Sequence, residues 1–253
     1  MDIYRGRIDL LDYVFFATVE RGKVYETGAF LHNYALAYAL KLSAAPYAHR
    51  QQKPNYGDDL ADLNQRGVYL TPARPLQLLY RLMQWNTIQE TYGFGKKPQS
   101  IGYPDWGFAR VLRPGSSFEF YALITDPTQV PESPVFRDLM AGRAGYARLG
   151  KFPAKIRLRL TRARRVEDKR GKFTAGLSIQ RGREAETQSA APLLFNWRDM
   201  AADPIICDVY PATLPTRLIA NPHFADGNYH IAEFGEEDRV MLPGNMQFVA
   251  RVG

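Results

Sequence analysis

The segment Lys155-Ile156-Arg157-Leu158-Arg159-Leu160 alternates strictly between basic and apolar residues. Successive side chains of a β-strand point to opposite faces. The pattern therefore predicts a strand over 153–165 that buries its apolar residues and presents a row of cations on its other face. Turn residues follow at 167–171, and we expect 172–180 to return as the hairpin partner of this strand.

The positive charge of the chain is concentrated around this strand. Residues 142–183 hold 14 of the 33 Lys and Arg residues but only two carboxylates, Glu167 and Asp168, whereas the whole chain has a net charge of +7. A solvated outer strand whose cations discourage edge pairing is one interpretation. Because neighbouring like charges repel, such an excess favours contact with a polyanion, and a phosphate backbone fits best. The cations of this strand that we expect to contact RNA are Lys155, Arg157, Arg159, Arg162 and Arg164.

A glycine-rich segment over 142–151 precedes the basic strand. Its glycines let backbone amides approach phosphates, its cations neutralise them, and Tyr146 offers a ring for stacking on a base. The spacing matches neither a Walker loop nor a dinucleotide fingerprint. A flexible turn leading into the strand is the alternative. The residues expected to contact RNA here are Arg143, Tyr146, Arg148 and Lys151.

The remaining pattern predicts a β-rich α+β fold. A strand followed by a helix at the N-terminus is how a βαββαβ ferredoxin-like unit begins. Residues 74–92 suit either a helix or a strand. We expect one domain over 1–253, with long insertions and a basic hairpin at about 142–183. The other expected strands are 3–16, 107–112, 117–124, 205–210 and 246–252, the expected helices are 30–42 and 135–141, and the expected loops are 44–66 and 93–106.

Composition excludes several classes of site. Cys207 is the single cysteine, so an intrachain disulfide and a zinc site built on several cysteines are excluded. No apolar run approaches the roughly 20 residues that span a bilayer, and the N-terminus lacks the apolar core of a signal peptide. We therefore expect a cytoplasmic protein without a membrane partner, and no metal or cofactor.

Two expected loops carry further candidates. His49, Arg50 and Lys53 suit phosphate contact and a solvated loop equally well. Four aromatic residues near the second loop suit core packing and interface anchoring equally well. They are Phe94, Tyr103, Trp106 and Phe108.

Three groups of residues, in order along the chain, resemble one protein family. The first is Tyr25-Glu26-Thr27, Leu31-His32-Asn33-Tyr34-Ala35-Leu36 and Tyr38-Ala39-Leu40; the second is Pro54-Asn55-Tyr56, Asp59-Leu60, Leu63-Asn64 and Gly67-Val68-Tyr69-Leu70-Thr71-Pro72-Ala73; the third is Arg148-Leu149-Gly150-Lys151. Together they resemble the Cas-five-like RAMP subunit, also called Csc-one, of type I-D CRISPR interference (Cascade) complexes. The similarity is good over 1–73 and 142–160 and weak over the C-terminal third.

The resemblance implies an RRM-type ferredoxin-like RAMP fold with a β-hairpin extension. It also implies a non-catalytic subunit of a prokaryotic ribonucleoprotein complex, which binds the five-prime handle of the crRNA. Such a subunit would contact the large signature subunit and the first backbone RAMP subunit, and target DNA is a further expected contact. Family members often carry His-Asp in the first strand, where this chain has Leu11-Asp12. That departure weakens a catalytic role for the position.

Two other functions fit the sequence. One is a metal-independent endoribonuclease that matures crRNA, which needs a general base and acid beside the scissile phosphate. His32 or His49 with Tyr25 or Lys53 would supply them, although no pairing is compelling. The other is a scaffold that contacts only protein.

Overall fold

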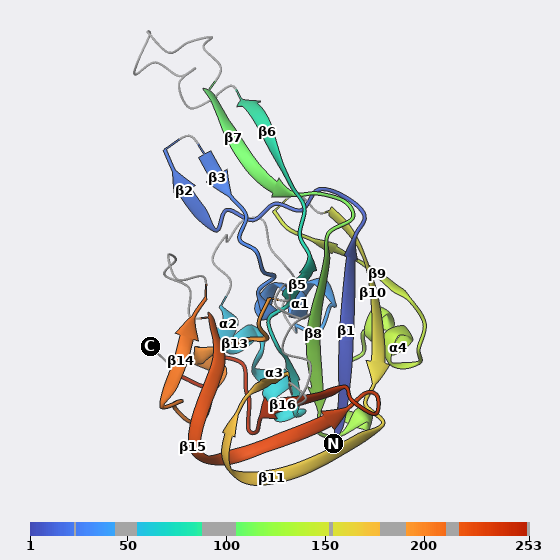
Figure 1. Cartoon of the computed structure of the whole chain (residues 1–253). Coiled ribbons are helices and arrows are strands. Elements are labelled where there is room, and N and C mark those ends of the chain that lie inside the picture. The colour runs from blue at the N-terminus through green and yellow to red at the C-terminus, as the bar shows by residue number, and fades with distance from the viewer. Residues whose placement is uncertain are drawn as a thin grey trace.

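The computed structural model describes residues 1–22, 24–43, 55–87, 105–151, 154–177, 191–210 and 218–251. It is a β-rich α+β structure in which three sheets are combined with short helices (Figure 1). Among the described helices, none is long and apolar enough to cross a membrane.

The central sheet contains the strands expected at the N-terminus, over 117–124 and over 153–165. Its order is β4-β8-β1-β10-β9, every neighbouring pair is antiparallel, and β5 also pairs with β8. Along the chain, the main strands and helices follow one another as β1, α1, β4, β8, α4 and β10. The bounds are β1 (Asp2–Leu10), β4 (Val68–Leu70), β5 (Arg74–Gln77), β8 (Ser117–Ile124), β9 (Gly145–Leu149) and β10 (Ala154–Arg162).

Helices cover one face of this sheet. The helices α1 (Asn33–Ala39) and α4 (Pro134–Met140) lie against β4, β9 and β10. Ser133 joins the two helices, because its Oγ accepts a hydrogen bond from Phe136 N–H at the start of α4 and donates one of 2.6 Å to the carbonyl of Leu40. Two shorter helices, α2 (Tyr56–Asp59) and α3 (Ala61–Gln65), occupy part of the segment expected to be a loop. Residues 44–54 of that segment lie outside the described part.

Strict alternation builds the core beneath these helices. Ile8 pairs across the sheet with Leu158 on one side and Phe118 on the other, and all three side chains are fully buried. Burying each such side chain contributes roughly 1.5–3 kcal/mol. Gly6 is required on the same face, since an added Cβ would lie 2.1 Å from the ring of Phe120.

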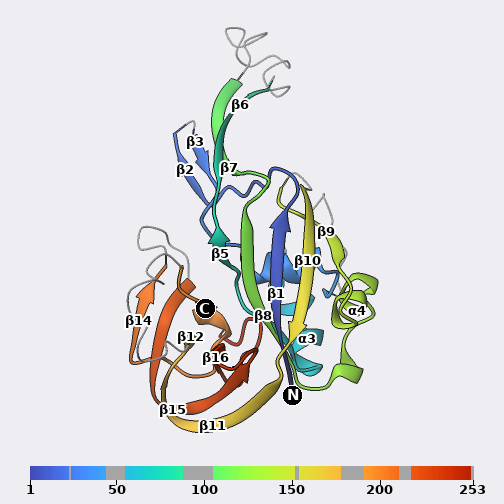
Figure 2. The same ribbon diagram turned by 45° about the vertical axis from the view of Figure 1, so that its right-hand side comes forward.

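A second sheet curves beside the first (Figures 1 and 2). Its order is β11-β15-β16-β12, and β13 and β14 also pair with β15. Its strands are β11 (Arg165–Thr174), β12 (Gly176–Leu177), β13 (Leu194–Asn196), β14 (Ile206–Val209), β15 (Leu218–Glu233) and β16 (Arg239–Pro243).

The prediction of a hairpin over 142–183, in which 172–180 pairs with the basic strand, is wrong. Both edges of β10 are occupied, by β1 and β9, so no edge remains for β11, which pairs with β15 instead. The chain changes sheets at Ala163 and Arg164, whose N–H groups donate to the carbonyls of Ile3 (2.8 Å) and Glu233 (2.7 Å). Residues 167–171, expected to form a turn, lie within β11.

A third sheet has the order β2-β3-β7-β6, with β3 and β7 parallel. Its long pair, β6 and β7, projects from the body of the molecule (Figure 2). The ambiguous segment 74–92 therefore forms strands as far as it is described. Residues 93–104, with Phe94 and Tyr103, lie outside the described part, as does the side chain of Trp106, whereas Phe108 is half-buried in β7. The bounds are β2 (Val19–Arg21), β3 (Val24–Glu26), β6 (Tyr80–Thr87) and β7 (Asp105–Leu112).

The C-terminal segment differs from the expected strand at 246–252. Phe248 lies in a turn, where its N–H donates to Oδ1 of Asn64 (2.7 Å) and its carbonyl accepts from Nδ2 of the same residue (2.8 Å). A side chain thus satisfies the backbone groups that a neighbouring strand would otherwise bind. The strand expected at 205–210 is confirmed as β14, the helix at 135–141 as α4, and the strands at 107–112 and 117–124 as part of β7 and as β8.

A buried carboxylate ties this segment to α1 and β4. Asp199 lies in a short 3-10 helix (Trp197–Asp199) and accepts four hydrogen bonds of 2.6–3.0 Å. The donors are Asn33 Nδ2, the hydroxyls of Tyr34 and Tyr69, and the N–H of Val249. Because each carboxylate oxygen accepts two bonds, the buried charge is satisfied.

Candidate nucleic-acid interface

The basic row of β10 lies on the face of the central sheet opposite α1 and α4. Lys155, Arg157 and Arg159 alternate with the buried Ile156 and Leu158 in β10. Neighbouring strands extend the row, because residues paired across a sheet share a face. Arg159 is paired with Arg7 of β1, Arg157 with Tyr146 of β9, and Lys155 with Arg148 of β9.

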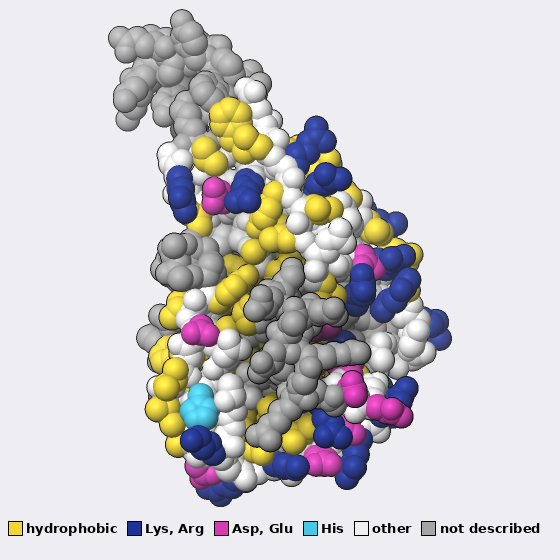
Figure 3. Space-filling view, in the orientation of Figure 1, with side chains coloured by type: hydrophobic (Ala, Val, Ile, Leu, Met, Phe, Trp, Pro, Cys, Tyr) yellow, Lys and Arg dark blue, Asp and Glu magenta, His cyan; other side chains and the backbone are white. Residues whose placement is uncertain are grey.

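We call these six residues the basic face. In Figure 3, Lys and Arg side chains gather along the right-hand side of the molecule, where Figure 1 places β1, β10 and β9. Lys155 and Arg159 have no carboxylate partner among the residues that the structure describes. The face thus combines five cations with one aromatic ring. The basic face consists of Arg7, Tyr146, Arg148, Lys155, Arg157 and Arg159.

One carboxylate lies within the basic face. Asp9 accepts a hydrogen bond of 3.1 Å from Nε of Arg7 and bonds of 3.2 and 2.9 Å from Nε and Nη2 of Arg157. Burial acts to raise the pKa of Asp9, but the hydrogen bonds from Arg157 and Arg7 outweigh it and hold the pKa below its ordinary value. Asp9 is therefore ionised at neutral pH.

Tyr146 is the aromatic member of the face. The residue is 52% exposed, and Nζ of Lys155 lies 4.9 Å from the centre of its ring. A base stacks on an exposed ring of this kind irrespective of its identity, and the neighbouring cation stays within reach of a phosphate. This pairing of ring and charge is suited to single-stranded nucleic acid.

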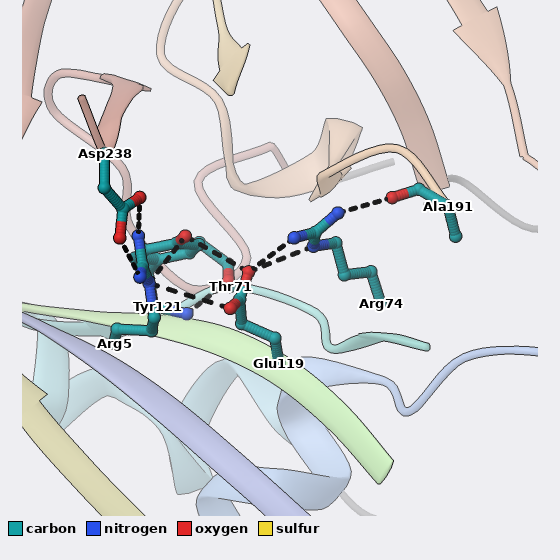
Figure 4. A network of polar contacts seen from close by, with 7 residues as sticks. All are labelled: Arg5, Thr71, Arg74, Glu119, Tyr121, Ala191 and Asp238. Carbon is teal, nitrogen blue, oxygen red and sulfur yellow. Dashed lines mark hydrogen bonds and ion pairs between the residues drawn. The ribbon is translucent and has the colours of Figure 1, made fainter. Parts of the chain in front are cut away.

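The second sheet limits the basic face on one side. Arg5 follows the same alternation as Arg7, but its guanidinium donates two hydrogen bonds of 2.6 Å to Asp238, which lies between β15 and β16 (Figure 4). It also lies 4.1 Å from the ring centre of Phe234. Arg5 is thus held by the second sheet, and Arg7 is the first cation of β1 beyond that contact.

The cations of β11 form a different surface. Arg165 and Lys169 lie 2.9 and 3.0 Å from Glu167, and Arg170 lies 3.0 Å from Asp226. Exposed ion pairs such as these contribute little to stability, but they neutralise the local charge. The positive segment of the sequence is therefore divided between two sheets, and Lys155 and Arg159, which have no carboxylate partner among the described residues, lie on the central one.

Four other predicted residues are not part of the basic face. Arg162 falls on the other face of β10 and is paired with Asp2 at 2.6 Å. Arg143 follows α4 and is ion-paired with Asp138. Arg164 lies in the link between the sheets, and Lys151 lies in the turn after β9. Three further predicted residues, His49, Arg50 and Lys53, lie outside the described residues.

His32, one of the bases considered for RNA cleavage, has a structural role. It is the N-cap of α1, where Nδ1 accepts a hydrogen bond of 3.3 Å from Tyr34 N–H. Desolvation lowers its pKa to about 4. Within the described ranges, no group of three or more His, Cys, Asp or Glu side chains is arranged to hold a metal ion.

Sequence reasoning missed Arg7 and Asp9. The signal was present, since Arg5, Arg7 and Asp9 alternate with Ile8 and Leu10 as the cations of 155–160 do with their apolar neighbours. What the sequence did not show is that the two alternating strands are paired side by side.

A family model described as type I-D CRISPR-associated protein Cas5/Csc1 matches residues 1–251. The chain belongs to this family. Membership supports a role in a CRISPR interference complex. A comparison with curated protein sequences finds no match.

Two solved structures match this chain at low identity and with TM-scores below 0.5. A CRISPR protein from Archaeoglobus fulgidus is 9% identical, with a TM-score of 0.42 over 96% of this chain and all of the other. A chain of the Type III-B Cmr-beta complex bound to cognate target RNA is 13% identical, with a TM-score of 0.41 over 64% of this chain. The match spans 60% of the length of that second protein.

Proposed function

We propose that this Cas5/Csc1-family chain is a non-catalytic RNA-binding subunit of a type I-D CRISPR interference complex. It holds the five-prime handle of the crRNA on the basic face of its central sheet. The observation that carries the proposal is the array of five cations and one exposed tyrosine on the sheet face opposite the helices. Cations beside a stacking ring are the features that single-stranded RNA recognition uses.

The strand order supports a ferredoxin-like, RRM-type interpretation of the central sheet. The connectivity β1-α1-β4-β8-α4-β10, with the order β4-β8-β1-β10, is that of a βαββαβ unit. In RRM domains the RNA lies on the sheet. The basic face occupies the corresponding surface, since α1 and α4 cover the opposite one.

Docking is the second part of the proposal. In this account the chain caps the guide RNA and contacts the large signature subunit and the first backbone RAMP subunit, which together present the guide to target DNA. Family membership supports the assembly role. The endoribonuclease alternative gains no support from His32, because that residue caps a helix and has a lowered pKa.

A pair of triple variants tests the RNA-binding role in the reconstituted complex. Lys155→Gln, Arg157→Gln and Arg159→Gln together remove three charges from the basic face. The matched control, Arg165→Gln, Lys169→Gln and Arg170→Gln, removes three charges from β11, where each cation is paired with Glu167 or Asp226. We expect the first variant to bind crRNA at least about tenfold more weakly and to reduce the slope of log affinity against log salt by about 2, as loss of three phosphate contacts to a single strand predicts.

The control variant is expected to stay within about twofold of the wild-type affinity. Equal losses for both triple variants would mean that net charge alone, and not the basic face, determines binding. Incubation of the chain with repeat RNA in the absence of metal tests the catalytic alternative. Cleavage that His49→Ala abolishes would overturn the non-catalytic assignment.

A further inference from the structure

Asp9 is unexpected in a surface proposed to bind phosphate. Its carboxylate is the acceptor for two of the five cations of the basic face, Arg7 and Arg157. A negative charge at this place weakens the attraction of the face for a polyanion. A role that depends on geometry rather than on charge would explain its position.

The three side chains form a fixed unit that spans two strands. Arg7 and Asp9 are two residues apart on β1 and therefore share a face, and Arg157 is the cross-strand partner of Asp9. The Asp9 side chain is 18% exposed, against 56% for Arg7 and 35% for Arg157. The carboxylate thus lies deeper than the two guanidinium groups that it binds.

The hydrogen bonds to Asp9 leave much of both guanidinium groups available. Arg7 uses only Nε, and Arg157 uses Nε and Nη2. In the described part of the chain, both Nη atoms of Arg7 and Nη1 of Arg157 have no hydrogen-bond acceptor. Guanidinium groups bind phosphate oxygens through such paired donors.

We infer that Asp9 is a positioning residue that holds Arg7 and Arg157 as a two-arginine clamp for a phosphodiester group of single-stranded RNA. The inference rests on the proposed function and names how one part of the basic face recognises its ligand. A long side chain that is already fixed loses less conformational entropy when it binds. Asp9 therefore strengthens binding even though its own charge opposes it.

The change Asp9→Asn separates geometry from charge. It removes one negative charge and an acceptor for the two arginines. If the electrostatic field alone determined affinity, the variant would bind RNA more tightly than the wild type. If Asp9 positions the clamp, the variant binds about tenfold more weakly, within the range of coupling between directly contacting residues.

The experiment measures the affinity of the reconstituted complex for crRNA, with repeat-derived single-stranded RNA as the probe for the isolated chain. Asp226→Asn is the matched control, because Asp226 binds Arg170 at 3.0 Å on β11, away from the basic face. We expect Asp226→Asn to leave affinity unchanged or slightly higher. The melting temperature of each variant verifies that it is folded.

A double-mutant cycle tests whether Asp9 acts through Arg157. Arg157→Lys keeps the charge but loses the planar fork, and we expect it to weaken binding about fivefold. In the Arg157→Lys background, Asp9→Asn is expected to change affinity by less than about threefold, because its effect through Arg157 is already lost. A purely structural role of Asp9 would give the same loss in both backgrounds.

The outcomes distinguish this inference from the proposed function. Wild-type or tighter binding by Asp9→Asn, or fully additive losses in the cycle, overturns the clamp while the basic face stands, provided that the triple variant at Lys155, Arg157 and Arg159 still binds weakly. Unchanged binding by that triple variant overturns the proposed function itself. If Asp9→Asn does not fold, wild-type affinity of Arg157→Lys overturns the clamp on its own.

Discussion

Replacing Glu119 by glutamine isolates the charge that holds Arg74 of β5, whose guanidinium contacts the segment before β13 of the second sheet. Oε1 of Glu119 accepts bonds of 3.0 and 2.8 Å from Nε and Nη2 of Arg74, and Oε2 lies 3.6 Å from Nε of Arg5 (Figure 4). Nη1 of Arg74 donates in turn to the carbonyl of Ala191 at 2.7 Å. Glutamine keeps the shape of this side chain but removes its charge.

The burial of the Arg74–Glu119 pair determines how much stability the change should cost. The side chains of Arg74 and Glu119 are 6% and 10% exposed. Removing one partner of a buried pair leaves an uncompensated charge and costs about 3–5 kcal/mol. Because glutamine retains an acceptor for Arg74, we expect Glu119→Gln to lower the free energy of unfolding by about 3 kcal/mol.

Asp238→Asn is the matched comparison within the same network. Asp238 binds Arg5 at 2.6 Å, but its side chain is 48% exposed. Water screens an exposed ion pair of this kind, so we expect Asp238→Asn to lower the free energy of unfolding by only about 0–1 kcal/mol. The two changes remove the same charge from two acids that contact Arg5, and they differ in burial.

Urea unfolding of the whole chain, followed by circular dichroism, measures both changes. The slope of free energy against urea must stay unchanged for the comparison to report stability. A cost of Glu119→Gln below about 1 kcal/mol, or a cost equal to that of Asp238→Asn, would refute the reasoning from burial.

Three further predictions concern the same fold. Gly6→Ala places a Cβ 2.1 Å from the ring of Phe120, so we expect it to lower the free energy of unfolding by about 1–3 kcal/mol in urea titrations; a neutral effect would show that the ring moves aside freely. Asp199→Asn places an amide donor against existing donors, and we expect a loss of about 2–4 kcal/mol in the same assay; wild-type stability would contradict the four-bond description. The third prediction concerns pH. Because the hydrogen bond from Arg5 lowers the pKa of Asp238 below 3.8, the stability it contributes is present above pH 3.8 and is lost as the pH falls through the folded-state pKa. The stability difference between wild type and Asp238→Asn should therefore shrink below about pH 4. A difference that grows there would contradict the expected direction of the pH dependence.

Local patterns predicted several strands of the central and third sheets. The alternation around Leu158 predicted β10 and its buried face, and the apolar runs near residues 110 and 120 predicted parts of β7 and β8. These elements were predictable because their burial follows a period of two along the chain.

Pairing between distant segments was not predictable in the same way. Residues 167–171 have the composition of a turn, yet they extend β11 because β15, more than 50 residues later, binds their backbone. Arg7 was missed for the same reason, since it belongs to the basic face only because β1 is paired with β10. Register is set by tertiary packing, and a single sequence does not record which strands meet.

Cross-linking of the reconstituted complex tests the central claim most directly. Ultraviolet irradiation of the complex with its crRNA, followed by mass spectrometry, identifies the peptides in contact with the guide. The account predicts cross-links from the five-prime handle to Tyr146 of β9 and to the peptide of β10 that carries Lys155. Cross-links confined to β11, with none on β1, β9 or β10, would contradict it.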